Sequence, residues 1–273
     1  MSPVPRELDR LRPVTSAQNA LVKELRKAFS RGEPTPEGAV AIDGVHLVEE
    51  ALRSGLRVRA LFVGQSAQAR AERLLPQLAA SVDILLLPDA VFAATVPTES
   101  PQGIAALVKL RPASLDDLLT APAPLFVVAV GLQDPGNLGT ILRSAEAFGA
   151  TAVIAAEGCV APTNSKVIRA SAGSLFRLPV LRLKTADLLP RLREAGFRLA
   201  ATSSHKGTPL GQAVLTGPLA LLVGNEGAGL PRDLLRHVGD TIVIPHSAHV
   251  ESLNAGIAAS ILLYEASQQR KNL

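Results

Sequence analysis

Long apolar runs that alternate with helical patterns constrain the fold of this chain more than any other feature. In the second half, segments such as LFVVAV (125–130) and PLALLVG (218–224) consist almost entirely of apolar residues. Strands of this kind are buried on both faces, as in a parallel sheet covered by helices. Further strands are expected at 150–156, 177–183, 197–203 and 240–245, and helices at about 139–148, 185–195, 230–237 and 252–269. The pattern predicts an α/β domain with a mostly parallel sheet.

The first half predicts a second, smaller α/β unit. A helix is expected over 15–30, with Thr15 or Ser16 as its N-cap. The remaining expected elements are helices at 45–55 and 68–80, a short apolar segment at 39–43, and strands at 58–64, 83–88 and 102–110. Because residues 111–124 are rich in proline, we predict one domain over 1–111 and another over 112–273.

Composition excludes several classes of protein. A single cysteine, Cys159, rules out a disulfide framework and a Cys-rich zinc site. Aromatic residues make up 3% of the chain, which disfavours a stacking platform for single-stranded nucleic acid. The start is charged and no apolar run approaches the roughly 20 residues that span a bilayer. We therefore expect a cytoplasmic protein with no membrane partner.

Positive charge is concentrated near the start of the chain. The whole sequence has a formal net charge of +4. Residues 1–31 alone hold seven basic side chains against three acidic ones, which equals that excess. Two interpretations remain open at this point: a solvated helix face, or a surface that contacts phosphate groups.

Common sites for nucleotides, hydrolysis and metals are absent from the sequence. No GxxxxGK[ST] loop, GxGxxG, GxSxG or HExxH motif is present, and the missing GxGxxG disfavours a Rossmann-type dehydrogenase. His246, His249 and Glu251 lie close together in a loop. A loop does not fix them on one face, so a hydrogen-bonding role is favoured and no metal is expected.

Three loops remain, each after a predicted strand of the second domain, and ligands bind at that edge of an open parallel sheet. In the loop 131–149, Asn137 is expected to cap a helix, Gly139 allows close backbone approach and Arg143 follows one turn later. The alternative is that these residues have only a structural role, as a capped helix with an arginine on its surface.

The other two loops carry glycines, a carboxylate and a helix start. The loop 222–231 has Gly224, Gly227 and Gly229 around Glu226, whose charge is poorly suited to binding a triphosphate. In the segment 244–270, Ser252 is expected to N-cap the last helix, with Asn254 inside its first turn. Small residues on that helix fit close core packing and a dimer interface equally well.

The order of the three loops closely resembles the three motifs of the SpoU (TrmH) family of RNA ribose 2′-O-methyltransferases, in the SPOUT superfamily. NxGxxxRxAxAFG, GNEGxGL and IPxxxxxESLNxxxAxxIxxYE match within 134–149, 223–231 and 244–265, and RASAGSLFRLPV (169–180) resembles a further family segment. TSAQN, IDGVHLVEEAL and TESPQGIAAL resemble the family's accessory domain, which is similar to ribosomal protein L30e. The match departs from the family at His246 and at Ala255-Gly256.

The resemblance implies a C-terminal SPOUT domain with a deep trefoil knot and an N-terminal L30e-like domain that binds substrate RNA. It implies that S-adenosyl-L-methionine contacts the knot loops, and that the protein is a homodimer. The implied residues are Gly224, Asn225, Ile244, Leu253 and Asn254 for the cofactor, and Asn137, Arg143, Glu226, Ser252 and Asn254 for catalysis. Arg143 is then expected to orient an RNA phosphate and stabilise the forming alkoxide, with Glu226 holding its guanidinium.

The expected activity is therefore methylation of a ribose 2′-hydroxyl in structured RNA, with 23S rRNA ahead of tRNA. A resistance enzyme that modifies a drug site on 23S rRNA has the same chemistry. A non-catalytic RNA-binding factor for ribosome assembly is the alternative from another class. Arg143, Glu226, Ser252 and Asn254, all present, argue against it.

Overall fold

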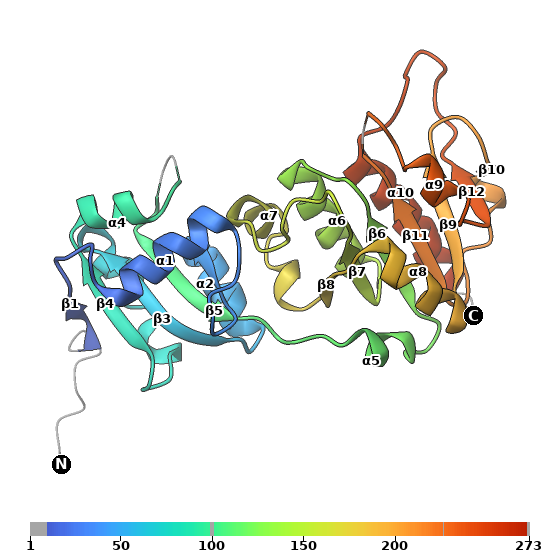
Figure 1. Ribbon diagram of the computed structural model, residues 1–273. Helices are drawn as coiled ribbons and strands as arrows, with labels where there is room; N and C mark the ends of the chain where they lie inside the picture. The colour runs from blue at the N-terminus through green and yellow to red at the C-terminus, as the bar shows by residue number, and fades with distance from the viewer. Residues whose placement is uncertain (1–9, 99–100, 226, 272–273) are drawn as a thin grey trace. The chain divides into compact units, whose positions relative to one another are not determined.

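The chain folds into two compact units, shown in a computed structural model that describes residues 10–98, 101–225 and 227–271 (Figure 1). One unit comprises Met1–Arg111 together with Thr163–Ile168. The other comprises Pro112–Pro162 and Arg169–Leu273.

The first unit is built on a mixed five-stranded sheet. The strands are β1 (Arg12–Pro13), β2 (Ala39–Asp43), β3 (Arg57–Gly64), β4 (Asp83–Leu87) and β5 (Ile104–Lys109), in the order β1-β4-β3-β5-β2. β3 and β1 pair with β4 in parallel, whereas β5 runs antiparallel to both β3 and β2. The strands predicted at 58–64, 83–88 and 102–110 are confirmed within two residues.

Helices cover the sheet of the first unit. α1 (Ala20–Arg31) and α4 (Asp89–Thr95) share a buried cluster with side chains of β2, β3, β4 and β5. α2 (Val45–Arg53) packs against β2, β3 and β5, and α3 (Gln68–Ala71) against β3. The expected helix over 68–80 is wrong, because the chain breaks into α3 and a 3₁₀ turn, Leu75–Gln77, that contains Pro76.

The predicted start of the first helix is also wrong. α1 begins at Ala20, and its N-cap is Asn19, whose side-chain oxygen accepts a hydrogen bond from the Leu21 amide at 3.0 Å. Thr15 and Ser16 lie before the helix. Asn is as good an N-cap as Ser, and only the geometry of the turn decides which of the polar residues ahead of the apolar stripe takes that role.

The second unit contains a seven-stranded sheet whose neighbouring strands are all parallel. The strands are β6 (Leu125–Ala129), β7 (Ala152–Ala155), β8 (Val180–Arg182), β9 (Arg198–Ser203), β10 (Thr208–Pro209), β11 (Leu219–Val223) and β12 (Asp240–Val243). Their order is β10-β12-β9-β11-β6-β7-β8. β6 and β11 are fully buried, so the prediction of a mostly parallel, doubly covered sheet is confirmed.

Helices lie on the sheet of the second unit as its apolar strands require. α6 (Pro135–Ala147) packs against α10 (Ala255–Lys271). The hydroxyl of Ser144 on α6 lies 2.6 Å from the hydroxyl of Ser260 on α10. α8 (Thr185–Glu194), α9 (Arg232–Leu235) and α5 (Leu115–Leu119) contribute leucines to a separate core cluster with β6, β7, β9 and β11. The short strand β10 carries no sequence signal that predicts it, and neither does α7 (Ser165–Ala170), whose residues 165–168 belong to the first unit. Among the described residues, no helix is long and apolar enough to cross a membrane.

Candidate functional site

Three loops of the second unit meet around one cavity of about 620 Å³. They follow β9, β11 and β12, so all three leave the carboxyl ends of neighbouring parallel strands. The lining includes Gly224 and Asn225 from the second loop, and Ile244, Ser252 and Leu253 from the third. These five residues were all expected at the site from the sequence, and the fold brings them together.

Asn225 organises the glycine-rich loop after β11. Its side-chain amide donates a hydrogen bond to the Gly131 carbonyl at 3.1 Å, across to the loop after β6. Its side-chain oxygen accepts from the amides of Gly227 and Ala228 at 2.9 and 3.2 Å. Asn225 and Gly229 also exchange both backbone hydrogen bonds. One side chain thus closes the loop on itself and fastens it to a neighbour.

Close approach of the backbone explains Gly224. A Cβ atom added at Gly224 would lie 2.4 Å from the carbonyl carbon of Gly229 and 2.6 Å from the Leu230 nitrogen. Only glycine leaves room for this fold of the loop. Gly139 is similar, because an added Cβ would lie 2.3 Å from the Cβ of Ala170.

Asn137 and Asn254 meet although they are far apart in sequence. The Asn254 side-chain amide donates a hydrogen bond to the Asn137 side-chain oxygen at 2.8 Å. Asn137 is buried, and this contact fastens the start of α10 to the first turn of α6. Both residues were predicted as part of the site. Neither lines the cavity, although Asn254 lies between Leu253 and Ala255, which do.

The expected caps of these two helices are wrong by two or three residues. Asp134 caps α6 by accepting from the Asn137 amide at 2.8 Å, because Pro135 takes the first helical position, where its missing N–H costs nothing. Asn254 caps α10, accepting from the Ile257 amide at 3.1 Å, while Ser252 lies before the helix on the cavity wall. Asn137 is therefore inside its helix and Asn254 outside.

Arg143 stands on α6, about two turns from its start, and is exposed to solvent. Its side chain makes no hydrogen bond or ion pair with any residue that the structure describes, and it does not line the cavity. Glu226, expected beside it, lies outside the described residues. Because the guanidinium of Arg143 has no partner among the described residues, it is available to a ligand with an anionic group.

The loop after β9 supplies lining residues that sequence reasoning missed. Thr202 and Ser203, at the end of β9, and His205 and Lys206, in the loop that follows, line the cavity. The available signal was their position after a buried strand of the parallel sheet. None of the three family motifs includes them. Predicting that they line the site would require knowing that β12 pairs with β9.

His246 lines the cavity and keeps a ring nitrogen, Nδ1, 2.7 Å from the Ile244 carbonyl oxygen. His249 and Glu251 are exposed. Within the described part of the chain, no group of three or more His, Cys, Asp and Glu side chains is placed to hold a metal ion. Ala255 and Gly256 also depart from the family motif. Ala255 lines the cavity, whereas Gly256 packs on Thr140.

Cys159, the one cysteine of the chain, lies beside the loop after β6. Its sulfur accepts a hydrogen bond from the Leu132 amide at 3.4 Å and donates to the Ala129 carbonyl at 3.2 Å. Burial raises the pKa of the thiol. A thiol held in its neutral form is a poor nucleophile, so Cys159 has a packing role here.

Two family models match the chain, one on each part. The model of the SpoU rRNA methylase family matches residues 124–264. A model of the MRM3-like substrate-binding domain matches residues 19–106.

Curated relatives match along almost the whole chain. The 23S rRNA (guanosine(2553)-2′-O)-methyltransferase RlmP of Bacillus subtilis is 35% identical, over 93% of this chain and 98% of its own length. The 23S rRNA (uridine(2479)-2′-O)-methyltransferase of Streptomyces viridochromogenes is 32% identical, over 88% and 86%.

The solved structures that are similar to this chain include methyltransferases as well. An AdoMet-bound rRNA methyltransferase from Sinorhizobium meliloti superposes with a TM-score of 0.81 at 29% identity, over 95% of this chain and 98% of that one. The SpoU methyltransferase AviRb from Streptomyces viridochromogenes, in complex with AdoMet, gives 0.79 at 29% identity, over 92% and 98%.

Proposed function

The chain belongs to the SpoU rRNA methylase family, and from this membership we propose that it methylates a ribose 2′-hydroxyl of 23S rRNA with S-adenosylmethionine as methyl donor. It is an RNA 2′-O-methyltransferase by its relationship to enzymes of that activity over nearly its full length. The observation that carries the proposal is the convergence of Gly224, Ile244 and Leu253 on one cavity beside the Asn137–Asn254 contact.

Ribosomal RNA is the favoured substrate over tRNA. The two 23S rRNA enzymes above align with most of this chain, both units included. A tRNA-modifying TrmH/SpoU enzyme from A. aeolicus covers 55% of it, with a TM-score of 0.50. An enzyme acting on 23S rRNA works where ribosomes are made, so we expect a cytoplasmic location.

The cavity suits the cofactor. Its volume of about 620 Å³ lies within the range of small-molecule pockets, and apolar side chains such as Ile244 and Leu253 offer flat walls for a purine. The glycine-rich loop contributes Gly224, Asn225 and residues 227–230 to the wall of the cavity. We assign Gly224, Asn225, Ile244, Leu253 and Asn254 to cofactor binding. S-Adenosylmethionine supplies an activated methyl group on a sulfonium, which leaves without acid assistance.

The remaining work falls to residues that face the RNA. A hydroxyl is a weak nucleophile, so its proton must leave as the new bond forms. A guanidinium keeps its proton at neutral pH, so Arg143 is assigned to orient a phosphate and stabilise the forming alkoxide, not to act as the base. Glu226 is assigned to hold that guanidinium, while Asn137, Asn254 and Ser252 fix the loops that align the two reactants.

We further propose the trefoil knot that the family resemblance implies. Its support is the strand order, in which β12 returns beside β9 after β11 has entered between β9 and β6. Two hydrogen bonds, from Asn254 to Asn137 and from Asn225 to Gly131, then connect the loops after β12 and β11 to the segment after β6. We assign residues 112–273 to this SPOUT domain and residues 1–111 to an L30e-like domain that binds the substrate RNA, supported by the substrate-binding model at 19–106.

A homodimer is proposed from the outer face of α10. Ile257 and Tyr264 are 53% and 52% exposed, and Ile261 lies between them on the same helical face. The Tyr264 ring meets Phe148, the residue that follows α6, edge to face, with centroids 5.7 Å apart. An exposed apolar stripe of this kind marks a protein contact.

Light scattering is expected to give twice the 28.5 kDa of one chain, because the α10 stripe is covered by a second copy. The double variant Ile257→Glu/Tyr264→Glu places two charges in that stripe and is expected to give single chains at micromolar concentration. A wild-type protein that runs as a single chain contradicts the dimer.

Deletion of the gene tests the function directly. We expect one ribose methylation to disappear from 23S rRNA and none from tRNA, as mapped by resistance of 2′-O-methylated positions to alkaline hydrolysis. Restoring the wild-type gene returns the mark, whereas an Arg143→Ala copy does not. An unchanged methylation map, or a mark restored by the Arg143→Ala copy, contradicts the proposal.

A further inference from the structure

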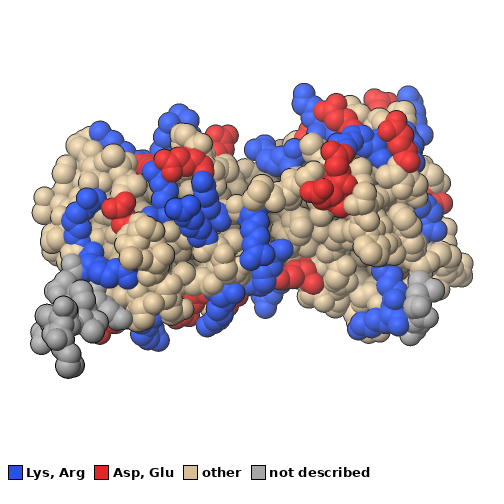
Figure 2. Space-filling view, turned by 90° about the horizontal axis from the view of Figure 1, so that it is seen from below, with Lys and Arg blue, Asp and Glu red and all other residues tan. Residues whose placement is uncertain are grey.

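On the face seen in Figure 2, basic and acidic side chains mix over both units, so charge density on that face does not identify a binding surface. Cations that are free of internal partners are more informative. On α1, Lys23, Arg26, Lys27 and Arg31 are all exposed. None of these four side chains makes a hydrogen bond or ion pair with a residue that the structure describes.

The four cations occupy one side of the helix. Lys23, Lys27 and Arg31 follow one another at four-residue spacing, and Arg26 lies three after Lys23, so they form one row of neighbours. The opposite side carries Val22, Leu25, Ala28 and Phe29, which are buried against the sheet. The apolar side therefore fixes the helix, and the basic side, which we call the α1 cationic face, points to solvent.

A β-bulge in β3 brings Arg59 to this helix. The register between β3 and β5 shifts between Val58 and Ala60, so Arg59 has no partner position on β5. Val58 pairs with Val108 and Ala60 with Leu107, which face opposite sides of the sheet; the extra residue lets Arg59 share the side of Ala60 and of α1. Bulges redirect side chains in this way.

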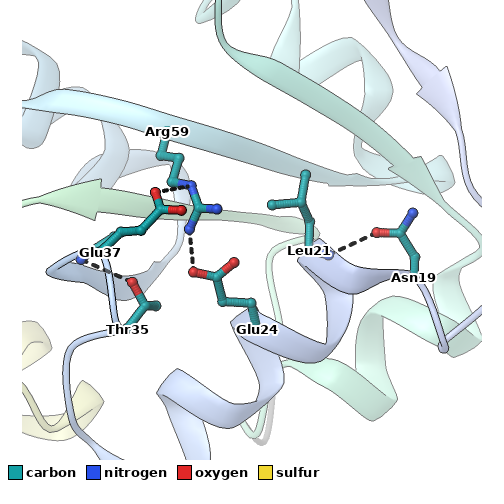
Figure 3. A network of polar contacts seen from close by, with 7 residues as sticks. Asn19, Leu21, Glu24, Thr35, Glu37 and Arg59 are labelled. Atoms are coloured by element: carbon teal, nitrogen blue, oxygen red, sulfur yellow. Dashed lines mark hydrogen bonds and ion pairs between the residues drawn. The ribbon is translucent and has the colours of Figure 1, made fainter.

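Arg59 binds two carboxylates at the edge of α1 (Figure 3). It donates to Glu24, and its Nε lies 3.0 Å from an oxygen of Glu37. Glu24 is the one acidic residue of α1 and stands three residues before Lys27, a spacing at which the two form an ion pair on a helix. With Glu24 held by the guanidinium of Arg59, Lys27 stays unpaired.

We propose that the α1 cationic face binds the phosphate backbone of the substrate RNA, and that Arg59 is a positioning residue that keeps Glu24 from neutralising it. The inference rests on the proposed function and extends it, since it names the surface and the chemical group recognised. Free, closely spaced cations match a chain of phosphates, and such contacts position RNA without reading its sequence.

A pair of charge-matched variants tests the face. Arg26→Gln/Lys27→Gln/Arg31→Gln removes two arginines and a lysine from α1. The control Arg57→Gln/Arg73→Gln/Lys109→Gln removes the same charges from exposed positions of the same unit that also lack side-chain partners among the described residues. Binding to a 23S rRNA transcript is measured over a range of salt concentrations.

The slope of log affinity against log salt is expected to flatten by about two to three for the α1 variant, because each lost phosphate contact removes roughly 0.7 to 0.9 from it. The control is expected to keep the wild-type slope. Equal slopes for the two variants overturn the proposal, as does a loss that appears on anionic phosphatidylglycerol vesicles and not on RNA. Failure of the wild-type protein to bind S-adenosylmethionine, measured in parallel by calorimetry, counts against the proposed function instead.

Arg59 is tested by rescue. Arg59→Met frees Glu24 to pair with Lys27, so RNA affinity falls and the salt slope flattens by about one. Adding Glu24→Gln removes the competing carboxylate and restores both, a result that a merely structural role for Arg59 does not give. A double variant that binds RNA no better than Arg59→Met overturns the positioning role.

Discussion

Replacing Arg143 by alanine is expected to slow methyl transfer by about a hundred- to a thousand-fold, the effect of losing one donor to a developing oxyanion. Affinity for S-adenosylmethionine is expected to stay within about twofold of wild type, because Arg143 does not line the cavity. The folded state is expected to be equally stable, since the side chain is exposed and makes no hydrogen bond or ion pair with a described residue that alanine would remove.

Single-turnover methylation of a 23S rRNA transcript measures the first quantity and calorimetry the second. Arg182→Ala, at an exposed position on β8, is the matched control and is expected to behave as wild type. Arg143→Lys is expected to fall between the two, because it keeps the charge and loses the paired donors of the guanidinium. Residual methylation close to wild type in Arg143→Ala removes this residue from the mechanism.

The fold of the second unit follows from its sequence because burial on both faces leaves a strong local signal. β6 and β11 read as uninterrupted apolar runs, and both are central strands. Helix caps were harder to place. Asp134 and Asn137 are both good N-caps, and only the position of Pro135 at the first helical residue settles which of them starts α6.

The sequence predicts only the part of the site that belongs to the family motifs. Of the three loops with motifs, those after β11 and β12 hold five predicted residues that line the cavity, whereas Asn137 and Arg143 from the loop after β6 do not line it. The roles assigned to these residues stay predictions. The lining residues from β9 and the loop after it were not predicted. Their contribution depends on the pairing of β12 with β9, two strands that are far apart in the sequence. The network of Arg59 was missed for a similar reason: a register shift between β3 and β5 leaves no mark in the local sequence.

Replacing Gly224 by alanine is expected to weaken S-adenosylmethionine binding by tenfold or more, that is by at least about 1.4 kcal/mol. The added methyl group would stand 2.4 Å from the Gly229 carbonyl carbon and 2.6 Å from the Leu230 nitrogen. Both are backbone atoms, so no side chain can turn aside and the loop itself must move. That movement displaces the wall of the cavity formed by residues 224, 225 and 227–230.

Gly211→Ala is the matched control, because nothing lies within 4 Å of a Cβ at Gly211 and its φ is not in the left-handed region. This variant is expected to keep wild-type affinity and thermal stability. Gly224→Ala is expected to lose about 1 to 3 kcal/mol of folding free energy through overpacking, so calorimetric titrations are run well below its unfolding temperature. If the folded Gly224→Ala protein binds S-adenosylmethionine as tightly as Gly211→Ala does, the glycine-rich loop is not a wall of the cofactor site, and the assignment of the cavity between the loops after β9, β11 and β12 is wrong.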